Sequence, residues 1–336
     1  MPDDKILLAH GSGGKLSHDL VSEILLPRFS NPFLEPLDDS ARITNQEGPV
    51  AFSTDSYVIN PLFFPGGDIG RLAVCGTVND LSMIGAVPSY LSLSLIIEEG
   101  LPVEVLKRIM SSVREAAEEA SVRIVTGDTK VVEHGAADRL FINTSGIGWI
   151  RQGVHLSGLH ARPGDMVLVS GFLGDHEIAV LSQREGFGFE GDLKSDCAPL
   201  NGLVARMLEV CPSIRCLRDP TRGGLATTLN EIASSSGVGI VLEDERIPVR
   251  ESVRGTCELL GLDPLYLANE GKLIAVCPPD EADRSLEAMK AHPLGQHAEI
   301  IGRVTEENPK TVPLHTLIGG RRVVDMLTGA QYPRIC

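Results

Sequence analysis

The sequence predicts an α/β (α+β) protein with two domains, and three observations carry this prediction: the length, the mixed periodicities and a linker-like segment near the middle. At 336 residues the chain has room for about two domains of ordinary size. Apolar runs with strand and helix periods interleave in both halves, separated by 35 Gly and 21 Pro. Residues 151–165 carry Gly, His and Pro without an apolar period, which is typical of a link between domains. We therefore expect one domain over 1–150, a second over 151–320 and a flexible tail over 321–336.

The composition excludes several classes of protein. Acidic residues outnumber Lys and Arg by 45 to 30, a formal net charge of −15, so the surface as a whole repels nucleic acid and anionic membranes. No apolar run approaches the ~20 residues that cross a bilayer, and the acidic start lacks the apolar core of a secretory signal. Seven scattered cysteines favour reduced thiols. We expect a cytoplasmic protein that binds neither nucleic acid nor membrane.

Strands and helices alternate in the first half. The clearest helix follows Leu101, with Pro102 suited to its first turn and an apolar stripe that runs from Leu106 to Ala120. Asp55 is expected to close the first strand, and a polar turn is expected at 126–130. The elements predicted here are a strand at 50–54, a helix at 69–84, a strand at 91–95, the helix after 101 and a strand at 123–125.

The second half repeats the alternation and ends in a tail. A helix is expected from Asp219 to Ser235, where Pro220 suits the first turn. The last stretch carries Gly329 and Pro333 without an apolar period, so its final seven residues are expected to reach about 25 Å as a mobile segment. Strands are predicted at 166–170, 240–242 and 273–276.

Several carboxylates lie where strands end or on an apolar helix face. Asp80 projects from the apolar stripe of the helix at 69–84, so its charge must be compensated. Asp55 and Asp128 follow strands, and Asp38 and Asp39 occupy a turn. Such a set is typical of a Mg²⁺ site shared with nucleotide phosphates. The alternative is that each aspartate only caps a helix or a turn.

Two glycine-containing segments are candidates for phosphate binding. His10–Lys15 has the glycines of a nucleotide loop but lacks the first Gly and the final Ser or Thr of a Walker loop, so a flexible turn is the alternative. Asp219–Leu225 opens a helix with two glycines and Arg222, which favours an anion site; a plain capped helix that packs tightly at its glycines is the alternative. A similar segment, 171–176, follows the strand at 166–170.

The last residue, Cys336, is a candidate nucleophile. A thiol is intrinsically nucleophilic, and one at a mobile end is sterically open. Arg334 favours the thiolate, whereas the terminal carboxylate opposes it. The alternative is an incidental terminal cysteine.

Four segments together resemble the ATP-using superfamily of aminoimidazole ribonucleotide synthetase, selenophosphate synthetase and thiamine-monophosphate kinase. They are Phe52–Ser56, Val78–Pro88, Thr126–Lys130 and Asp219–Leu225. The terminal Pro-Arg-Ile-Cys narrows the resemblance to the HypE family of hydrogenase maturation proteins, over essentially the whole chain. Ser12, in the loop His10–Lys15, favours this family over selenophosphate synthetase, which usually has Cys or selenocysteine near this loop.

The resemblance implies a dimerising N-terminal αβ domain, an α/β domain behind it, and ATP in the cleft between them and partly across a homodimer. It implies Mg²⁺ ligands at Asp39, Asp55, Asp80 and Asp219. Asp38 is the alternative to Asp39, because the family's Asp-Asp-Ala-Ala reads Asp-Asp-Ser-Ala here. The residues that it places near the phosphates are Gly11, Gly13, Gly14, Asp128, Thr129 and Arg222.

The activity that the resemblance implies is ATP-dependent dehydration of an S-carbamoyl group on Cys336 to a thiocyanate. The cyanide would pass to iron for a nickel-iron hydrogenase. The implied partners are a carbamoyltransferase that loads Cys336 and an iron-carrying maturation scaffold complex. Lys130 and Glu270 are the candidates for the base, and a surface ion pair is the ordinary alternative for both.

Two other functions remain open from the sequence. A small-molecule kinase or synthetase of the same superfamily would be unaffected by removal of the last four residues. A non-catalytic nucleotide-binding assembly factor would support maturation even with Asp80→Asn.

Overall fold

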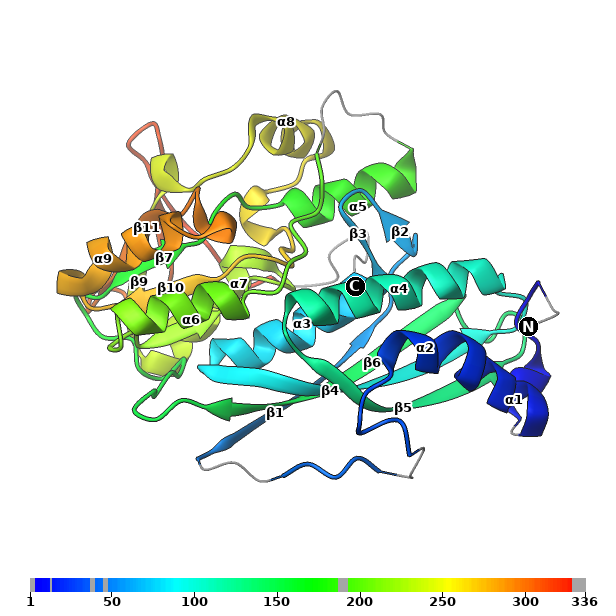
Figure 1. Cartoon of the computed structure of the whole chain (residues 1–336). Helices are drawn as coiled ribbons and strands as arrows, with labels where there is room; N and C mark the ends of the chain where they lie inside the picture. The colour runs from blue at the N-terminus through cyan, green and yellow to red at the C-terminus, as the bar shows by residue number, and fades with distance from the viewer. Residues whose placement is uncertain (1–3, 13, 37–39, 45–47, 187–192, 328–336) are drawn as a thin grey trace.

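The computed structural model describes residues 4–12, 14–36, 40–44, 48–186 and 193–327 (Figure 1). Two sheets form the framework. A four-stranded sheet lies in the N-terminal half, in the order β1-β6-β4-β5, and a seven-stranded sheet lies in the C-terminal half, in the order β13-β12-β9-β11-β7-β10-β8. The mixed two-domain α/β architecture predicted from the sequence is confirmed. None of the described helices is long and apolar enough to cross a bilayer.

The N-terminal half builds one sheet with helices on one face. Its strands are β1 (Val50–Tyr57), β4 (Ala86–Glu98), β5 (Arg123–Val132) and β6 (Leu140–Ile150), with a small hairpin of β2 (Phe63–Phe64) and β3 (Gly67–Asp68). Its helices are α1 (Gly14–Leu20), a π-helical turn (Val21–Leu25), α2 (Leu26–Phe29), α3 (Ile69–Met83) and α4 (Val103–Glu119).

Local sequence explains where α3 and α4 begin. The Asp68 carboxylate caps α3 by accepting hydrogen bonds from the amides of Gly70 and Arg71, at 2.7 and 3.1 Å. Helix α4 starts directly after Pro102, as predicted, and buries its apolar stripe against the sheet and α3. Both helices therefore lie on the same face of the sheet.

The two faces of the N-terminal sheet carry different side chains. Thr54 and Ser56 share one face with Asn143 and Ser145, since Asn143 Nδ2 donates to Ser56 Oγ at 3.0 Å and Ser145 Oγ donates to Thr54 Oγ1 at 2.8 Å. Ser53 and the other odd-numbered positions of β1 point to the helix-covered face. We call the face that carries Asn143 the open face.

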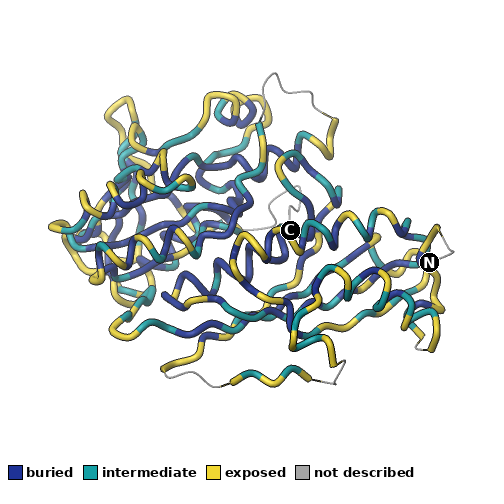
Figure 2. The backbone as a smooth tube through the Cα atoms, in the orientation of Figure 1, coloured by how far each residue is buried: buried dark blue, intermediate teal, exposed yellow. Residues whose placement is uncertain are grey.

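The C-terminal half is a sheet with helices on both faces. Its strands are β7 (Met166–Val169), β8 (Cys216–Arg218), β9 (Gly239–Glu243), β10 (Ile274–Cys277), β11 (Glu299–Thr305), β12 (Pro313–His315) and β13 (Arg321–Val323). Its helices are α5 (Asp175–Glu185), α6 (Asn201–Val210), α7 (Gly224–Ser236), α8 (Glu251–Leu260) and α9 (Pro279–Lys290). Val167 and Val169 pack with α7, whereas Leu168 packs with α6 and α9. The central strands are therefore buried along their length (Figure 2).

Four sequence-based expectations about element ends are wrong. Asp55 lies inside β1, which continues to Tyr57, and residues 126–130 are not a turn but the middle of β5, paired with Ser92–Ile96 of β4. Polar side chains are tolerated in this strand because one face of the sheet is open, and the same polar residues are typical of a turn. Helix α7 begins at Gly224 rather than Asp219, because Gly223 adopts a left-handed conformation at φ 72°. Residues 321–323 of the expected tail form an edge strand.

Candidate functional site

Two of the predicted acidic residues, Asp55 and Asp80, lie together on the helix-covered side of the N-terminal sheet, where it meets the C-terminal domain. Ser53 Oγ donates a hydrogen bond to Asp80 Oδ2 at 2.8 Å. Burial raises the pKa of Asp80, the Ser53 hydrogen bond lowers it, and the Asp55 charge raises it again. Arg222 Nη2 lies 3.5 Å from Asp55 Oδ1. The negative charge of Asp80 is therefore compensated as predicted, by the Ser53 hydroxyl donor and by the charges of Arg218 and Arg222.

Asp219 and Glu270 add two more carboxyl groups to this cluster. Burial raises the pKa of Asp219 to about 7, with further increases from Asp80 and Asp55. Burial also raises the pKa of Glu270 well above its usual value, helped by the charges of Asp219 and Asp196. The carboxyl groups thus destabilise one another as anions, and a cation or a donor group bound here relieves that repulsion.

Two buried asparagines, which were not singled out from the sequence, hold this cluster in place. Asn79 Nδ2 donates to the carbonyl oxygens of Ala198 and Glu270, at 3.1 and 3.3 Å, next to Asp80 in α3. Asn269 Nδ2 donates to Pro220 O at 3.1 Å, and Asn269 Oδ1 accepts from the Gly174 amide. The only sequence signal was their position beside Asp80 and Glu270.

The glycine pair before α7 fits the packing alternative. A Cβ at Gly224 would lie 2.5 Å from Leu267 O, and Gly224 has φ +58°. Both features require glycine whether or not an anion binds. Arg222, in contrast, is exposed and points its charge towards Asp55.

The glycine loop and the Asp128 segment meet in a second place. Gly11 lines a cavity of about 510 Å³ together with residues 126–130 and apolar side chains of α1 and α2. A Cβ at Gly11 would lie 2.6 Å from Val131 N, so only glycine fits this approach. Gly14 begins α1 at φ +73°.

Asp128 and Asp55 lie on opposite faces of the sheet. Asp128 pairs with Ser94, which pairs with Asn143, so Asp128 belongs to the open face; Asp55 pairs with the buried Thr144 on the helix side. They also lie in the two edge strands, β5 and β1, about three strand spacings or ~14 Å apart. One chain therefore does not bring the predicted phosphate residues into a single cluster.

Lys130 shares the open face with Asp128. Its Nζ lies 3.1 Å from an Asp128 carboxylate oxygen, and both side chains are more than 60% exposed. Thr129, between them, donates its amide to Asp128 Oδ1 at 2.8 Å. In the isolated chain Lys130 therefore forms a surface ion pair, which is the ordinary alternative to a role as the base. Glu270, the other candidate base, is buried.

A Mg²⁺ site fits the chemistry of the carboxyl cluster. Among the residues that the structure describes, no three Asp, Glu, His or Cys side chains gather closely enough to hold a metal ion by themselves. The donors are nonetheless hard oxygens; beyond the effect of burial, Asp55 raises the pKa of Asp80 and Asp80 raises the pKa of Asp219, and a divalent cation neutralises this surplus negative charge. Phosphate oxygens and further carboxylates would complete the ligand set.

Some predicted site residues lie outside the described residues. These are Gly13, Asp38, Asp39 and Cys336. The described chain nevertheless shows where the last segment starts: Val324 is buried, and the Tyr266 hydroxyl donates to Asp325 O at 2.9 Å.

Two family models match the chain. The model "AIR synthase related protein, N-terminal domain" matches residues 37–150. The model "AIR synthase related protein, C-terminal domain" matches residues 162–315.

Relatives cover the whole chain at high identity. The chain is 56% identical over 329 residues to the carbamoyl dehydratase HypE of Azotobacter vinelandii, covering 98% of this chain and 96% of the relative. It resembles a crystal structure of the hydrogenase maturation protein HypE in complex with ATP, with a TM-score of 0.95, 53% identity and coverage of 98% and 99%. It also resembles a chain of a HypE–HypF complex, with a TM-score of 0.81, 51% identity and coverage of 92% and 99%.

Proposed function

The chain belongs to the HypE family of carbamoyl dehydratases, and from this premise we propose that it dehydrates an S-carbamoyl group carried on its own Cys336. The observation that carries the proposal is the combination of full-length similarity to that family with Cys336 and with a last segment held at Asp325 by Tyr266, four residues before Glu270. ATP supplies the driving force, and the product is a thiocyanate.

The chemistry requires that the carbamoyl oxygen become a leaving group. Attack of this oxygen on the γ-phosphorus of ATP forms the O–P bond, releases ADP and, with loss of one N–H proton, gives an O-phosphorylated thioimidate, Cys–S–C(=NH)–O–phosphate. Loss of the second N–H proton with cleavage of the C–O bond then gives the thiocyanate and inorganic phosphate. Such a phosphoryl transfer depends on positioning and on charge neutralisation. Mg²⁺ bound by Asp55, Asp80, Asp219 and Asp39 would supply neutralising charge at the phosphates.

Glu270 is our proposed base. Its side chain is buried, and a carboxylate with a raised pKa accepts a proton more readily than an exposed one. The Glu270 amide donates to Asp196 Oδ1 at 3.0 Å, and its carbonyl accepts from Asn79, so its backbone is fixed at both ends. Lys130 is the second candidate, on the open face.

The tail is long enough to reach this base. Asp325 is held by Tyr266, and Glu270 lies only four residues after Tyr266, within about 14 Å along the chain. The eleven residues 326–336 span up to about 36 Å when extended. Cys336 is therefore a substrate tethered close to its site, and buried surroundings protect the reacting group from water.

We also propose that the site is completed by a homodimer. The open face of the N-terminal sheet exposes Phe52 at 69% and Val50 at 51%, together with Val87 and Ile96. Apolar side chains on a sheet face favour burial against a partner. Because Asp55 and Asp128 lie in the two edge strands of one sheet, pairing two copies edge to edge brings the β5 strand of one chain, with Asp128, next to the β1 strand of the other, with Asp55. This arrangement unites the two groups of predicted phosphate residues.

Two partners follow from the proposed reaction. The solved HypE–HypF complex supports a carbamoyltransferase that loads Cys336. An iron-carrying maturation scaffold complex would accept the cyanide.

Removal of residues 333–336 tests the proposal against a kinase or synthetase. We expect ATP turnover in the presence of the loading enzyme to be abolished while the melting temperature is unchanged. Undiminished turnover of a small-molecule substrate by the truncated chain would support the other function.

A further inference from the structure

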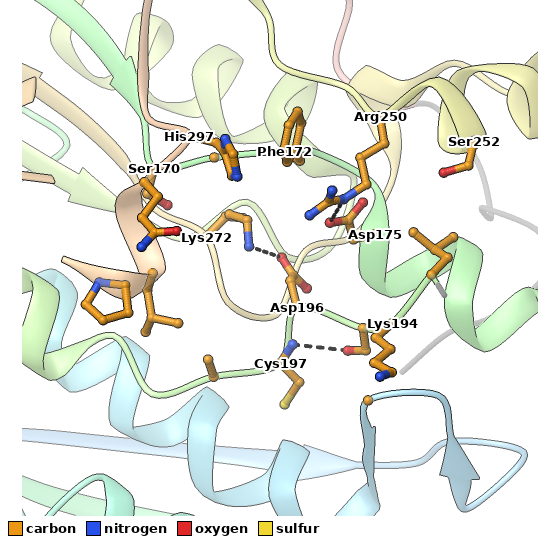
Figure 3. Close-up of a pocket in the computed structure, with 18 of the residues that line it drawn as sticks. Ser170, Phe172, Asp175, Lys194, Asp196, Cys197, Arg250, Ser252, Lys272 and His297 are labelled. Atoms are coloured by element: carbon orange, nitrogen blue, oxygen red, sulfur yellow. Dashed lines mark hydrogen bonds and ion pairs between the residues drawn. The ribbon is translucent and has the colours of Figure 1, made fainter. Parts of the chain in front are cut away.

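A second cavity lies between the two domains, apart from the carboxyl cluster. It has a volume of about 740 Å³ and lies between Gly66 and Arg71 of the N-terminal half and a lining from the C-terminal half (Figure 3). That lining consists of residues 170–172, Asp175, residues 193–198, Arg250, Ser252, Lys272, Pro293, Leu294, Gln296 and His297. Pockets for small ligands commonly have this size and lie between domains. Asp55, Asp80, Asp219 and Glu270 are not among the residues that line it.

The lining is positively charged in an acidic protein. Four cationic side chains and two carboxylates line the cavity, and Arg71 also pairs with Glu119 outside the lining at 2.7 Å, whereas the whole chain has a formal charge of −15. The cations are Arg71, Lys194, Arg250 and Lys272, and the carboxylates are Asp175 and Asp196. A concave, partly buried cationic surface attracts small anions.

Ion pairs fix two of these cations towards the cavity. Arg250 Nε lies 2.9 Å from Asp175 Oδ2, and its guanidinium stacks over the Phe172 ring at 4.2 Å. Lys272 Nζ lies 3.1 Å from Asp196 Oδ2, with both side chains at least 88% buried. Figure 3 shows both pairs around the cavity. Cations held in place lose little conformational entropy when a ligand binds.

The segment 170–175 gives the cavity a loop of the type that binds phosphate. It follows β7 and leads into α5; Gly171 and Phe172 line the cavity, whereas the Gly174 amide donates to Asn269 Oδ1 and is not available to a ligand. Gly171 allows the Lys272 side chain to approach, since a Cβ there would lie 3.3 Å from Lys272 Cε. A helix N-terminus after such a loop carries partial positive charge.

One buried carboxylate oxygen in the wall points to a ligand with a donor group. Asp175 Oδ1 has no hydrogen-bond partner, although the side chain is only 5% exposed. An unpaired buried oxygen is destabilising, and a donor group on a ligand removes this cost. Ser170, which accepts from the Leu273 amide at 3.0 Å, adds a hydroxyl to the same wall.

We propose that this cavity binds a small phosphate monoester that carries hydroxyl or amino groups. The cations and the loop at α5 take the phosphate, and Asp175 Oδ1 accepts from a hydroxyl or amino group. Because the cavity lies between the domains, the ligand contacts both of them.

Ribose 5-phosphate is a suitable probe, because it combines a phosphate with hydroxyl donors. Calorimetric titration of the full-length protein, with the non-hydrolysable ATP analogue AMPPNP and Mg²⁺ present at saturation, should show one saturable site per chain. Ribose should not bind, and inorganic phosphate should bind more weakly than ribose 5-phosphate. Arg250→Gln and Lys194→Gln should each weaken the affinity about tenfold, the effect of one charge-assisted hydrogen bond.

Arg206→Gln, in an exposed ion pair on α6, is the matched control and should leave the affinity unchanged. Melting temperatures establish that each variant is folded. The absence of saturation in the millimolar range, equal binding of ribose and ribose 5-phosphate, or unchanged affinity in both cavity variants would overturn the proposal. None of these outcomes depends on dehydratase activity, so the test is separate from that of the proposed function.

Discussion

The Tyr266 hydroxyl donates a hydrogen bond to the Asp325 carbonyl oxygen at 2.9 Å, and this contact fixes where the last residues leave the body of the protein. Asn230 Nδ2 holds the preceding carbonyl, Val324 O, at 2.8 Å. The departure point lies beside the turn Pro264–Tyr266 that leads to Glu270. The end of the chain is therefore tethered near the proposed base.

Doubling the tether should slow the tail-dependent reaction only moderately. If eleven Gly and Ser residues are inserted after Leu327, the effective concentration of Cys336 at the site falls roughly threefold, because it varies with about the −3/2 power of tether length. Tail-dependent ATP turnover should fall by the same factor under conditions where docking limits the rate. The same eleven residues added before Met1 serve as the control. Unchanged turnover in the insertion variant would contradict a tethered substrate.

Ser53→Ala should weaken the Mg²⁺ dependence of the reaction. The variant removes the hydrogen bond that orients Asp80, so the Mg²⁺ concentration for half-maximal ATP turnover should rise about tenfold. A Mg²⁺ titration of turnover measures this. Ser89→Ala, at a half-buried serine on β4 whose hydroxyl donates to Val87 O, should behave like the native protein. Equal Mg²⁺ requirements in both variants would exclude this role for Ser53.

Two inactive variants should restore activity when mixed. Asp55→Asn and Asp128→Asn each damage both sites of a homodimer if every site takes Asp55 from one chain and Asp128 from the other. After exchange of subunits, half of the dimers are mixed and each has one intact site, so about one quarter of the sites recover. ATP turnover before and after exchange measures the recovery.

The control for this mixing is a double variant, Asp55→Asn with Asp128→Asn on one chain. Mixed with the native protein, it should leave no intact site in a mixed dimer, so that only native dimers contribute. No recovery from the two single variants, despite confirmed exchange, would place both residues in the same chain's site.

Protonation of His176 should destabilise the protein in acid. Burial lowers the pKa of His176 from 6.5 to about 4. Between these values the unfolded chain binds a proton that the folded chain does not, so stability is highest above pH 6.5 and falls as the pH drops towards 4. The full loss is on the order of 3 kcal/mol. Denaturant titrations across this range should show a flatter profile for His176→Phe than for the native protein, with His155→Phe, at an exposed residue, as the matched substitution.

Helix periodicity could be predicted from the sequence, whereas the start of α7 and the ends of several strands could not. The apolar stripe from Leu106 to Ala120 and Pro102 at the first turn predict the position of α4 to within about one residue at each end, because a sustained apolar period of 3.6 indicates a helix and not a strand. The polar residues 126–130 suggest a turn in the sequence but lie in strand β5. This edge strand has one open face, where polar side chains are tolerated at strand positions. Sequence alone does not show which face of an edge strand the helices leave uncovered.

The candidate site could be predicted by residue type but not by its arrangement. Asp80 on an apolar helix face signalled a compensated charge, and Ser53 supplies that compensation. The separation of Asp55 and Asp128 on opposite faces depends on the register of four strands, which follows from long-range pairing. Asn79 and Asn269 gave no signal of their own, because their role is to bond to backbone groups distant in sequence.

Intact-mass analysis of the native chain tests the central claim most directly. The protein is first loaded with a carbamoyl group by its carbamoyltransferase, then incubated with ATP and Mg²⁺. We predict a loss of one water, about 18 Da, located by fragmentation at Cys336, with one ADP formed per chain. Formation of ADP with the carbamoyl mass unchanged, or a loss of water located at any residue other than Cys336, would contradict the account.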